Sequence, residues 1–119
     1  MVLLNAEKNS KTKKSNFKKK IEHSILEKEL LSKVAKYRSL TEKALSLIEI
    51  KAEEGTLGNA VAQDFLAMAQ NYFSDGNFFE KKGDFLTALA AYSYAHAWLD
   101  AGVRARLFHA EDDQLFTLP

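Results

Sequence analysis

Three polar side chains of complementary chemistry recur at every fourth position near the end of the chain, namely His96, Asp100 and Arg104. Residues four apart lie on one face of a helix, so Asp100 would stand between the other two and could bond both. One interpretation is a polar site in which Asp100 orients His96 for proton transfer, or Arg104 meets an anion. The other is structural, because a His within an apolar stripe is commonly a hydrogen-bonded core residue. The spacing leaves both open.

Tyr72 and Asp75 precede this stretch on a second predicted helix, and they could face the same edge across a helical hairpin. The candidate polar site therefore comprises Tyr72, Asp75, His96, Asp100 and Arg104. The histidines are scattered along the chain and there is no Cys, so we expect no metal site and no cofactor.

Signals for an enzyme are nearly absent, since the chain has no glycine-rich phosphate loop and no serine nucleophile motif. One exception is Arg104 followed after four residues by His109, which resembles the catalytic motif of the helical HEPN ribonucleases. The resemblance would imply RNA cleavage by these two residues. Ala105 stands where that family tends to have a polar residue, so we expect a non-catalytic protein and keep the ribonuclease as the weakest alternative.

The elements that must position these residues are helices. Among 119 residues there are five Gly and a single Pro, the last residue, and long stretches have apolar side chains at helical spacing. We predict an all-α fold, an up-down-up three-helix bundle with a long first helix. The predicted helices span about residues 16–54, 59–82 and 85–108, joined by turns at Gly55 and Gly83. We expect the second helix to continue unbroken through Gly76.

The third predicted helix has an unusual composition, because residues 85–99 include no Asp, Glu, Lys or Arg. An ordinary surface helix is charged on its outer face. Tyr94, Trp98 and Ala101 fall on the side away from the predicted core seam. We expect these three residues to form an interface, covered either by the first helix or by a second copy of the protein.

Charge is divided unevenly along the chain. Residues 1–20 hold seven lysines against one glutamate, although the whole chain has a net charge of only +1. We predict that residues 1–15 form a basic, disordered tail and that residues 109–119 form an acidic tail. Six lysines are candidate phosphate contacts for an RNA partner, and these are Lys11, Lys13, Lys14, Lys18, Lys19 and Lys20. The alternatives are a solubilising tail and a tail that folds back on the acidic remainder of the chain, including Glu111-Asp112-Asp113.

The length fits one domain, and no apolar stretch approaches the length needed to span a bilayer. We therefore expect no membrane association. The absence of Cys is compatible with a reducing compartment, and we expect a cytoplasmic protein.

Two stretches resemble the archaeal "domain of unknown function 357" family. They are residues 67–84, with the Tyr72-Phe73-x-Asp75 segment and the Lys82-Gly83-Asp84 turn, and residues 88–104, with Ala95-His96-x-x-Leu99-Asp100-Ala101-Gly102-Val103-Arg104. The resemblance covers about residues 25–108. It implies a small three-helix bundle of unassigned biochemistry, in which Tyr72, Asp75, His96, Asp100 and Arg104 coincide with motif positions.

From these observations we predict a non-catalytic helical interaction protein that self-associates or binds a protein partner through its apolar third helix. The alternative is an RNA- or ribonucleoprotein-associated factor that uses the lysine-rich N-terminal segment.

Overall fold

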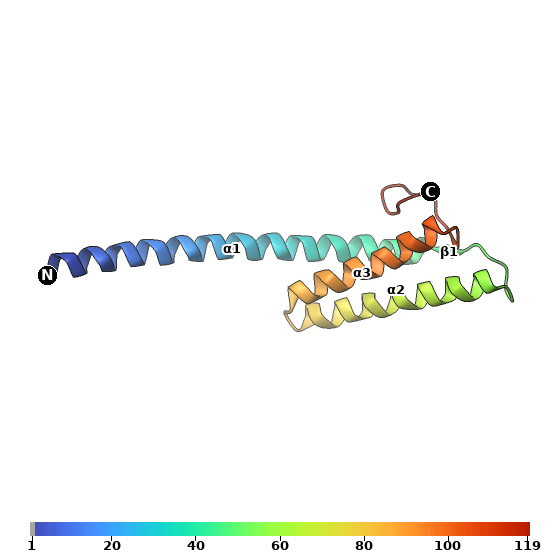
Figure 1. Ribbon diagram of the computed structural model, residues 1–119, viewed down its shortest axis with the longest axis horizontal. Helices are drawn as coiled ribbons and strands as arrows, with labels where there is room; N and C mark the ends of the chain where they lie inside the picture. Colours follow the sequence, from blue (N-terminus) through green and yellow to red (C-terminus); the bar gives the residue numbers. More distant parts are fainter. Residues whose placement is uncertain (1) are drawn as a thin grey trace. The chain divides into compact units, whose positions relative to one another are not determined.

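The computed structural model describes residues 2–119, with side chains described from Lys13 onward. Three helices and two short strands follow one another as α1 (Val2–Leu47), β1 (Glu49–Ile50), α2 (Leu57–Lys81), α3 (Phe85–Arg104) and β2 (Phe108–His109) (Figure 1). The predicted all-α fold is confirmed. The chain divides into two compact units, Met1–Ser32 and Lys33–Pro119, and each is described by itself.

The first unit is the N-terminal part of α1. The helix begins at Val2, where the composition had predicted a disordered segment over residues 1–15. No Gly or Pro occurs between residues 2 and 47, so nothing in the local sequence interrupts the backbone ladder. The side chains of residues 13–29 are exposed.

The second unit contains the bundle, formed by residues 33–47 of α1 together with α2 and α3. Val34, Thr41 and Ala44 of α1 are fully buried and lie three or seven residues apart, on one face of the helix. The helix ends at Leu47, earlier than the predicted residue 54, because the chain becomes extended at β1 and pairs with β2. In the antiparallel pair Glu49 lies opposite His109 and Ile50 lies opposite Phe108.

The α2–α3 hairpin is built by capping. Thr56 accepts a hydrogen bond from the backbone N–H of Asn59 at the start of α2, and Asp84 accepts one from Thr87 at the start of α3. Between the helices Gly83 has a φ of 80° and donates to the Glu80 carbonyl. This left-handed glycine ends α2 and turns the chain back, so that α2 and α3 lie side by side and antiparallel (Figure 1).

Helix α2 is continuous through Gly76, as predicted. The reason for a glycine there is a tertiary contact, because the ring of Tyr92 on α3 occupies the space of a side chain at that position. Gly102 on α3 plays the same role for the ring of Phe108. Both glycines therefore lie under aromatic rings.

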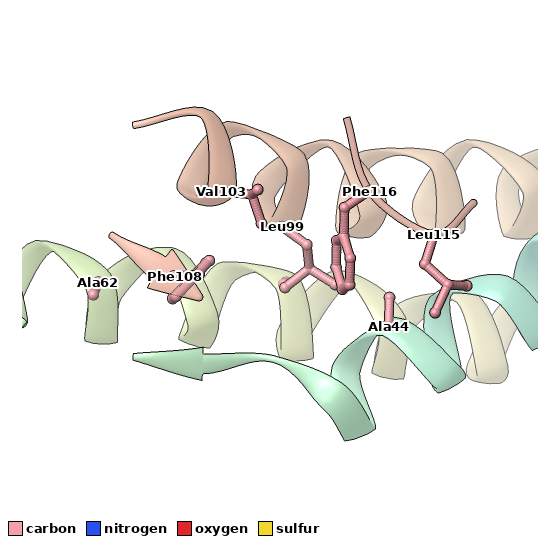
Figure 2. Close-up of a cluster of buried hydrophobic side chains, with 8 residues drawn as sticks. Ala44, Ala62, Leu99, Val103, Phe108, Leu115 and Phe116 are labelled. Carbon is pink, nitrogen blue, oxygen red and sulfur yellow. The ribbon is translucent and has the colours of Figure 1, made fainter. Parts of the chain in front are cut away.

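The main core cluster includes residues from the end of the chain. Leu115 and Phe116 are buried at 5% and 4% exposure and pack with Ala44 and Leu99 (Figure 2). The prediction that residues 109–119 form an acidic tail is therefore wrong for this part of the segment. The charged residues Glu111 to Asp113 form an exposed to half-buried turn, and the two apolar side chains beyond it supply the burial energy that orders the end of the chain.

Among the helices of residues 2–119, none has the length and apolar composition required to cross a membrane.

Candidate functional site

The three polar residues at helical spacing form a continuous edge on α3, and each contacts the C-terminal segment, defined here as residues 115–118. His96 Nε2 lies 2.6 Å from the carbonyl oxygen of Leu115. Asp100 Oδ1 accepts a hydrogen bond of 2.9 Å from the backbone N–H of Thr117. Arg104 Nη1 donates to the Leu118 carbonyl at 2.8 Å. We call His96, Asp100 and Arg104 the α3 polar edge.

The hydrogen bonds of His96 indicate which ring nitrogen carries the proton. A carbonyl oxygen only accepts, so Nε2 donates to Leu115. In a neutral imidazole with the proton on Nε2, Nδ1 accepts a hydrogen bond of 3.2 Å from the hydroxyl of Thr41. Asp100 Oδ2 is 4.0 Å from Nε2, and Asp100 Oδ1 is already bonded to Thr117. Both imidazole nitrogens are thus satisfied by structural partners.

The other two residues of the predicted polar site lie elsewhere. The Tyr72 ring stacks on Tyr94, with centroids 5.5 Å apart, and Asp75 is exposed. Within the part of the chain that the structure describes, no hydrogen bond or ion pair links Tyr72 or Asp75 to the α3 polar edge. The hairpin aligns α2 with a different side of α3, a rotational relationship that sequence spacing does not reveal.

Tyr94, Trp98 and Ala101, predicted to form an interface, line one shallow apolar hollow of about 310 Å³ together with Ala97. We call these four residues the α3 aromatic face. The Tyr94 side chain is 60% exposed. Residues of α2 hold the two rings in place, because Tyr72 stacks on Tyr94 and the edge of Phe65 meets Trp98 at a centroid distance of 5.0 Å.

A partly buried polar network around Tyr92 was not anticipated from the sequence. The Tyr92 hydroxyl lies 2.7 Å from Asn77 Oδ1 and 2.9 Å from Glu80 Oε1, and Arg38 of α1 forms an ion pair with Glu80. Burial raises the pKa of the Tyr92 phenol well above its usual value of 10.0, and the hydrogen bond to Glu80 and the negative charge of that carboxylate raise it further. Glu80 of α2 therefore links all three helices, because it pairs with Arg38 of α1 and accepts from Tyr92 of α3.

Arg104 and His109 do not form a joint site. Arg104 ends α3 and bonds Leu118, whereas His109 lies in β2 with Nε2 3.1 Å from Glu111 Oε1. In residues 13–119 no hydrogen bond or ion pair connects the two side chains.

The predicted phosphate contacts Lys13, Lys14, Lys18, Lys19 and Lys20 are exposed on α1, and Lys11 lies outside the residues whose side chains are described. Across the described side chains, no group of three or more His, Asp or Glu residues has an arrangement that could hold a metal ion.

Comparison with known proteins identifies relatives of this arrangement. A family model described as "Protein of unknown function (DUF357)" matches residues 36–108. The crystal structure of protein AF1782 from Archaeoglobus fulgidus, which carries the same family description, is similar with a TM-score of 0.59 and 27% sequence identity. That match covers 72% of this chain and 99% of the other. No curated protein matches the sequence.

Proposed function

This chain belongs to the family described as "Protein of unknown function (DUF357)", and we propose that it is a non-catalytic interaction protein that self-associates through the α3 aromatic face. The observation that carries the proposal is the shallow apolar hollow lined by Tyr94, Ala97, Trp98 and Ala101. Exposed aromatic side chains in apolar surroundings are typical of the residues that contribute most to protein association.

The order of side-chain sizes along this face supports a second copy as the occupant. Tyr94 is large, Ala97 and Ala101 are small, and Tyr94 and Ala101 lie two helical turns apart. Two α3 helices packed antiparallel about the point between Ala97 and Trp98 would place Tyr94 of each copy over Ala101 of the other. A twofold interface requires this kind of self-complementary patch.

The rigidity of the face also favours association. Phe65 and Tyr72 hold the rings of Trp98 and Tyr94 from one side, so little side-chain freedom remains to be lost on binding. Charged residues are absent from positions 85–99, which lowers the cost of desolvating the face.

Sedimentation velocity over a concentration series, up to roughly 200 μM, tests the proposal. We expect the wild-type chain to form a dimer. Ala97→Glu should weaken dimerisation at least tenfold, because it places a charge at the centre of the interface. Ala67→Glu is the matched control, since Ala67 is an exposed residue of α2 on the side away from Phe65 and Tyr72. A wild-type chain that remains monomeric throughout would refute self-association through this face.

A second candidate function is RNA association through α1, favoured by the exposure of five lysines between residues 13 and 20. Each phosphate contact adds to the salt dependence of binding, with a slope of about 0.7 per contact for single strands. We propose that these lysines contact phosphates of an RNA partner.

The test compares two variants of equal net charge by fluorescence anisotropy with a labelled single-stranded RNA at several salt concentrations. One carries Gln at positions 13, 14, 18, 19 and 20, and the control carries Gln at positions 36, 43, 51, 81 and 82, all exposed lysines. We expect the first to lose affinity and salt dependence, and the control to retain most of both. Equal loss in the two variants would contradict a specific role for α1.

A further inference from the structure

A stripe of exposed apolar side chains runs along the N-terminal half of α1. Phe17, Ile21 and Ile25 follow one another at intervals of four residues, and Leu31 lies on the same side of the helix. At about 100° per residue, these four positions span about a third of the helix circumference. Their side chains are between 40% and 67% exposed. We call these four residues the α1 apolar stripe.

The arrangement of these residues is typical of an interaction surface. Single apolar residues scattered over a protein surface are common, whereas several on one side of one helix form a contiguous patch. The stability of a helix comes mainly from the packing of its apolar face rather than from its backbone alone. A partner that covers the α1 apolar stripe would supply this packing.

The charges beside the stripe favour a second copy of the chain as that partner. Residues 13–20 include five lysines and no acidic residue, whereas residues 21–31 include three glutamates and one lysine. One half of the segment is therefore complementary to the other half. Parallel packing of two such helices would place lysines beside lysines. Antiparallel packing places the lysine-rich half of each copy beside the glutamate-containing half of the other.

Ser24 provides a centre for antiparallel packing. Phe17 and Leu31 each lie seven residues, about two helical turns, from Ser24. A twofold axis at Ser24 therefore sets Phe17 of one copy over Leu31 of the other, and the small side chain at the centre lets the two helices approach closely. Between Phe17 and Leu31, Lys28 is the only charged residue on this side of the helix.

We propose that the α1 apolar stripe is a second self-association surface, on which residues 13–31 of two copies pack as antiparallel helices. Four apolar residues from each copy make a smaller interface than most stable dimers have, so we expect a dissociation constant of roughly 300 μM. The surface includes no residue of the α3 aromatic face and goes beyond the proposed function.

The full chain carrying Ala97→Glu isolates this surface, because that substitution disrupts the α3 aromatic face. In sedimentation velocity up to about 1 mM, we expect this chain to dimerise. Adding Ile21→Glu should weaken dimerisation at least tenfold, because it places a charge within the stripe. Adding Leu26→Glu is the matched control, since Leu26 is 63% exposed on the opposite side of α1, and it should have little effect.

An Ala97→Glu chain that stays monomeric, or equal effects of Ile21→Glu and Leu26→Glu, overturns the proposal. Lys28→Leu tests it in the opposite direction, because it completes the stripe and should strengthen dimerisation at least tenfold. If Ile21→Glu alone weakens dimerisation of the wild-type chain and Ala97→Glu alone does not, the proposed function fails while this inference holds.

Disulfide formation tests the orientation, because the chain has no cysteine of its own. In the Ala97→Glu chain, Ser24→Cys should give a covalent dimer on mild oxidation. Lys14→Cys should not, since antiparallel packing about Ser24 separates the two copies of residue 14 by about 30 Å. Equally efficient crosslinking of the two variants overturns the antiparallel arrangement.

A lipid surface is the competing partner for an apolar stripe flanked by lysines. The glutamates of residues 21–31 disfavour it, because anionic headgroups repel them. Cosedimentation with phosphatidylserine-containing vesicles separates the two partners, and we expect the Ala97→Glu chain to bind no better with Ile21 than with Ile21→Glu. Vesicle binding that Ile21→Glu removes, in a chain that is monomeric in solution, overturns the proposal.

Discussion

The ring of Tyr92 lies against the backbone of Gly76 so closely that a Cβ atom at position 76 would be 2.4 Å from Cε1 of the ring. Tyr92 is fully buried, and its hydroxyl is held by Asn77 and Glu80 of the same helix α2. The ring therefore has no free space into which it can retreat. The close packing of α3 against α2 therefore requires a glycine at position 76.

Gly76→Ala should consequently destabilise the protein by about 1–3 kcal/mol, the usual cost of overpacking a core. A loss of stability would identify the packing contact as its cause, because helix propensity alone predicts that alanine at this position stabilises the protein by about 1 kcal/mol. Urea unfolding followed by circular dichroism measures the change. Asn71→Ala, at an exposed position of the same helix, is the control and should have little effect or a small stabilising one. A Gly76→Ala protein as stable as wild type would contradict the close contact.

Ionisation of Tyr92 makes the free energy of unfolding depend on pH in the alkaline range. Its raised pKa keeps the folded phenol protonated, whereas the unfolded phenol ionises near 10. The contribution of Tyr92 to the free energy of unfolding is therefore complete below pH 10, and it is lost as the pH rises above that value. Between pH 8 and pH 11 the advantage of wild type over Tyr92→Phe should shrink by about 1.4 kcal/mol. Urea unfolding of both proteins at both pH values checks this, and an unchanged difference would show that the phenol ionises equally in both states.

Arg106, two residues beyond the end of α3, has a left-handed conformation with a φ of 63°, and its N–H donates to the Val103 carbonyl. A side chain in this conformation costs about 1 kcal/mol relative to glycine. We expect Arg106→Gly to raise the free energy of unfolding by about that amount. Arg106→Ala separates this effect from loss of the side chain, because alanine keeps the Cβ atom and should bring no gain. Thermal unfolding of the two variants side by side provides the comparison.

Leu115 belongs to the core although it lies four residues from the end of the chain. Leu115→Ala should cost about 2–4 kcal/mol, as is usual for a buried leucine. Leu57→Ala makes the same chemical change at a position that is 82% exposed and should cost less than about 0.5 kcal/mol. Similar losses in the two variants, measured by urea unfolding, would mean that the C-terminal segment is not packed as described.

Several features of this protein follow from the sequence because their causes are local. The break at Lys82-Gly83-Asp84 combines a left-handed glycine with a capping aspartate, and those two residues suffice to end one helix and begin the next. Spacing alone places His96, Asp100 and Arg104 on one edge, and Tyr94, Trp98 and Ala101 on another. The motif from Ala95 to Arg104 also identifies the family, which the match over residues 36–108 confirms.

What those edges meet was decided only by the tertiary structure, because contact between distant segments depends on the rotation of each helix and on the path of the chain between them. Tyr72 packs on Tyr94 rather than joining His96, and the α3 polar edge meets a segment whose composition had indicated an acidic tail. The feature of the sequence that could have indicated a packed C-terminal segment is the apolar pair Leu115 and Phe116, which follows the acidic turn. Two apolar residues so close to the end of a chain have no periodicity to reveal them, and their role becomes visible only where Ala44 and Leu99 lie beside them.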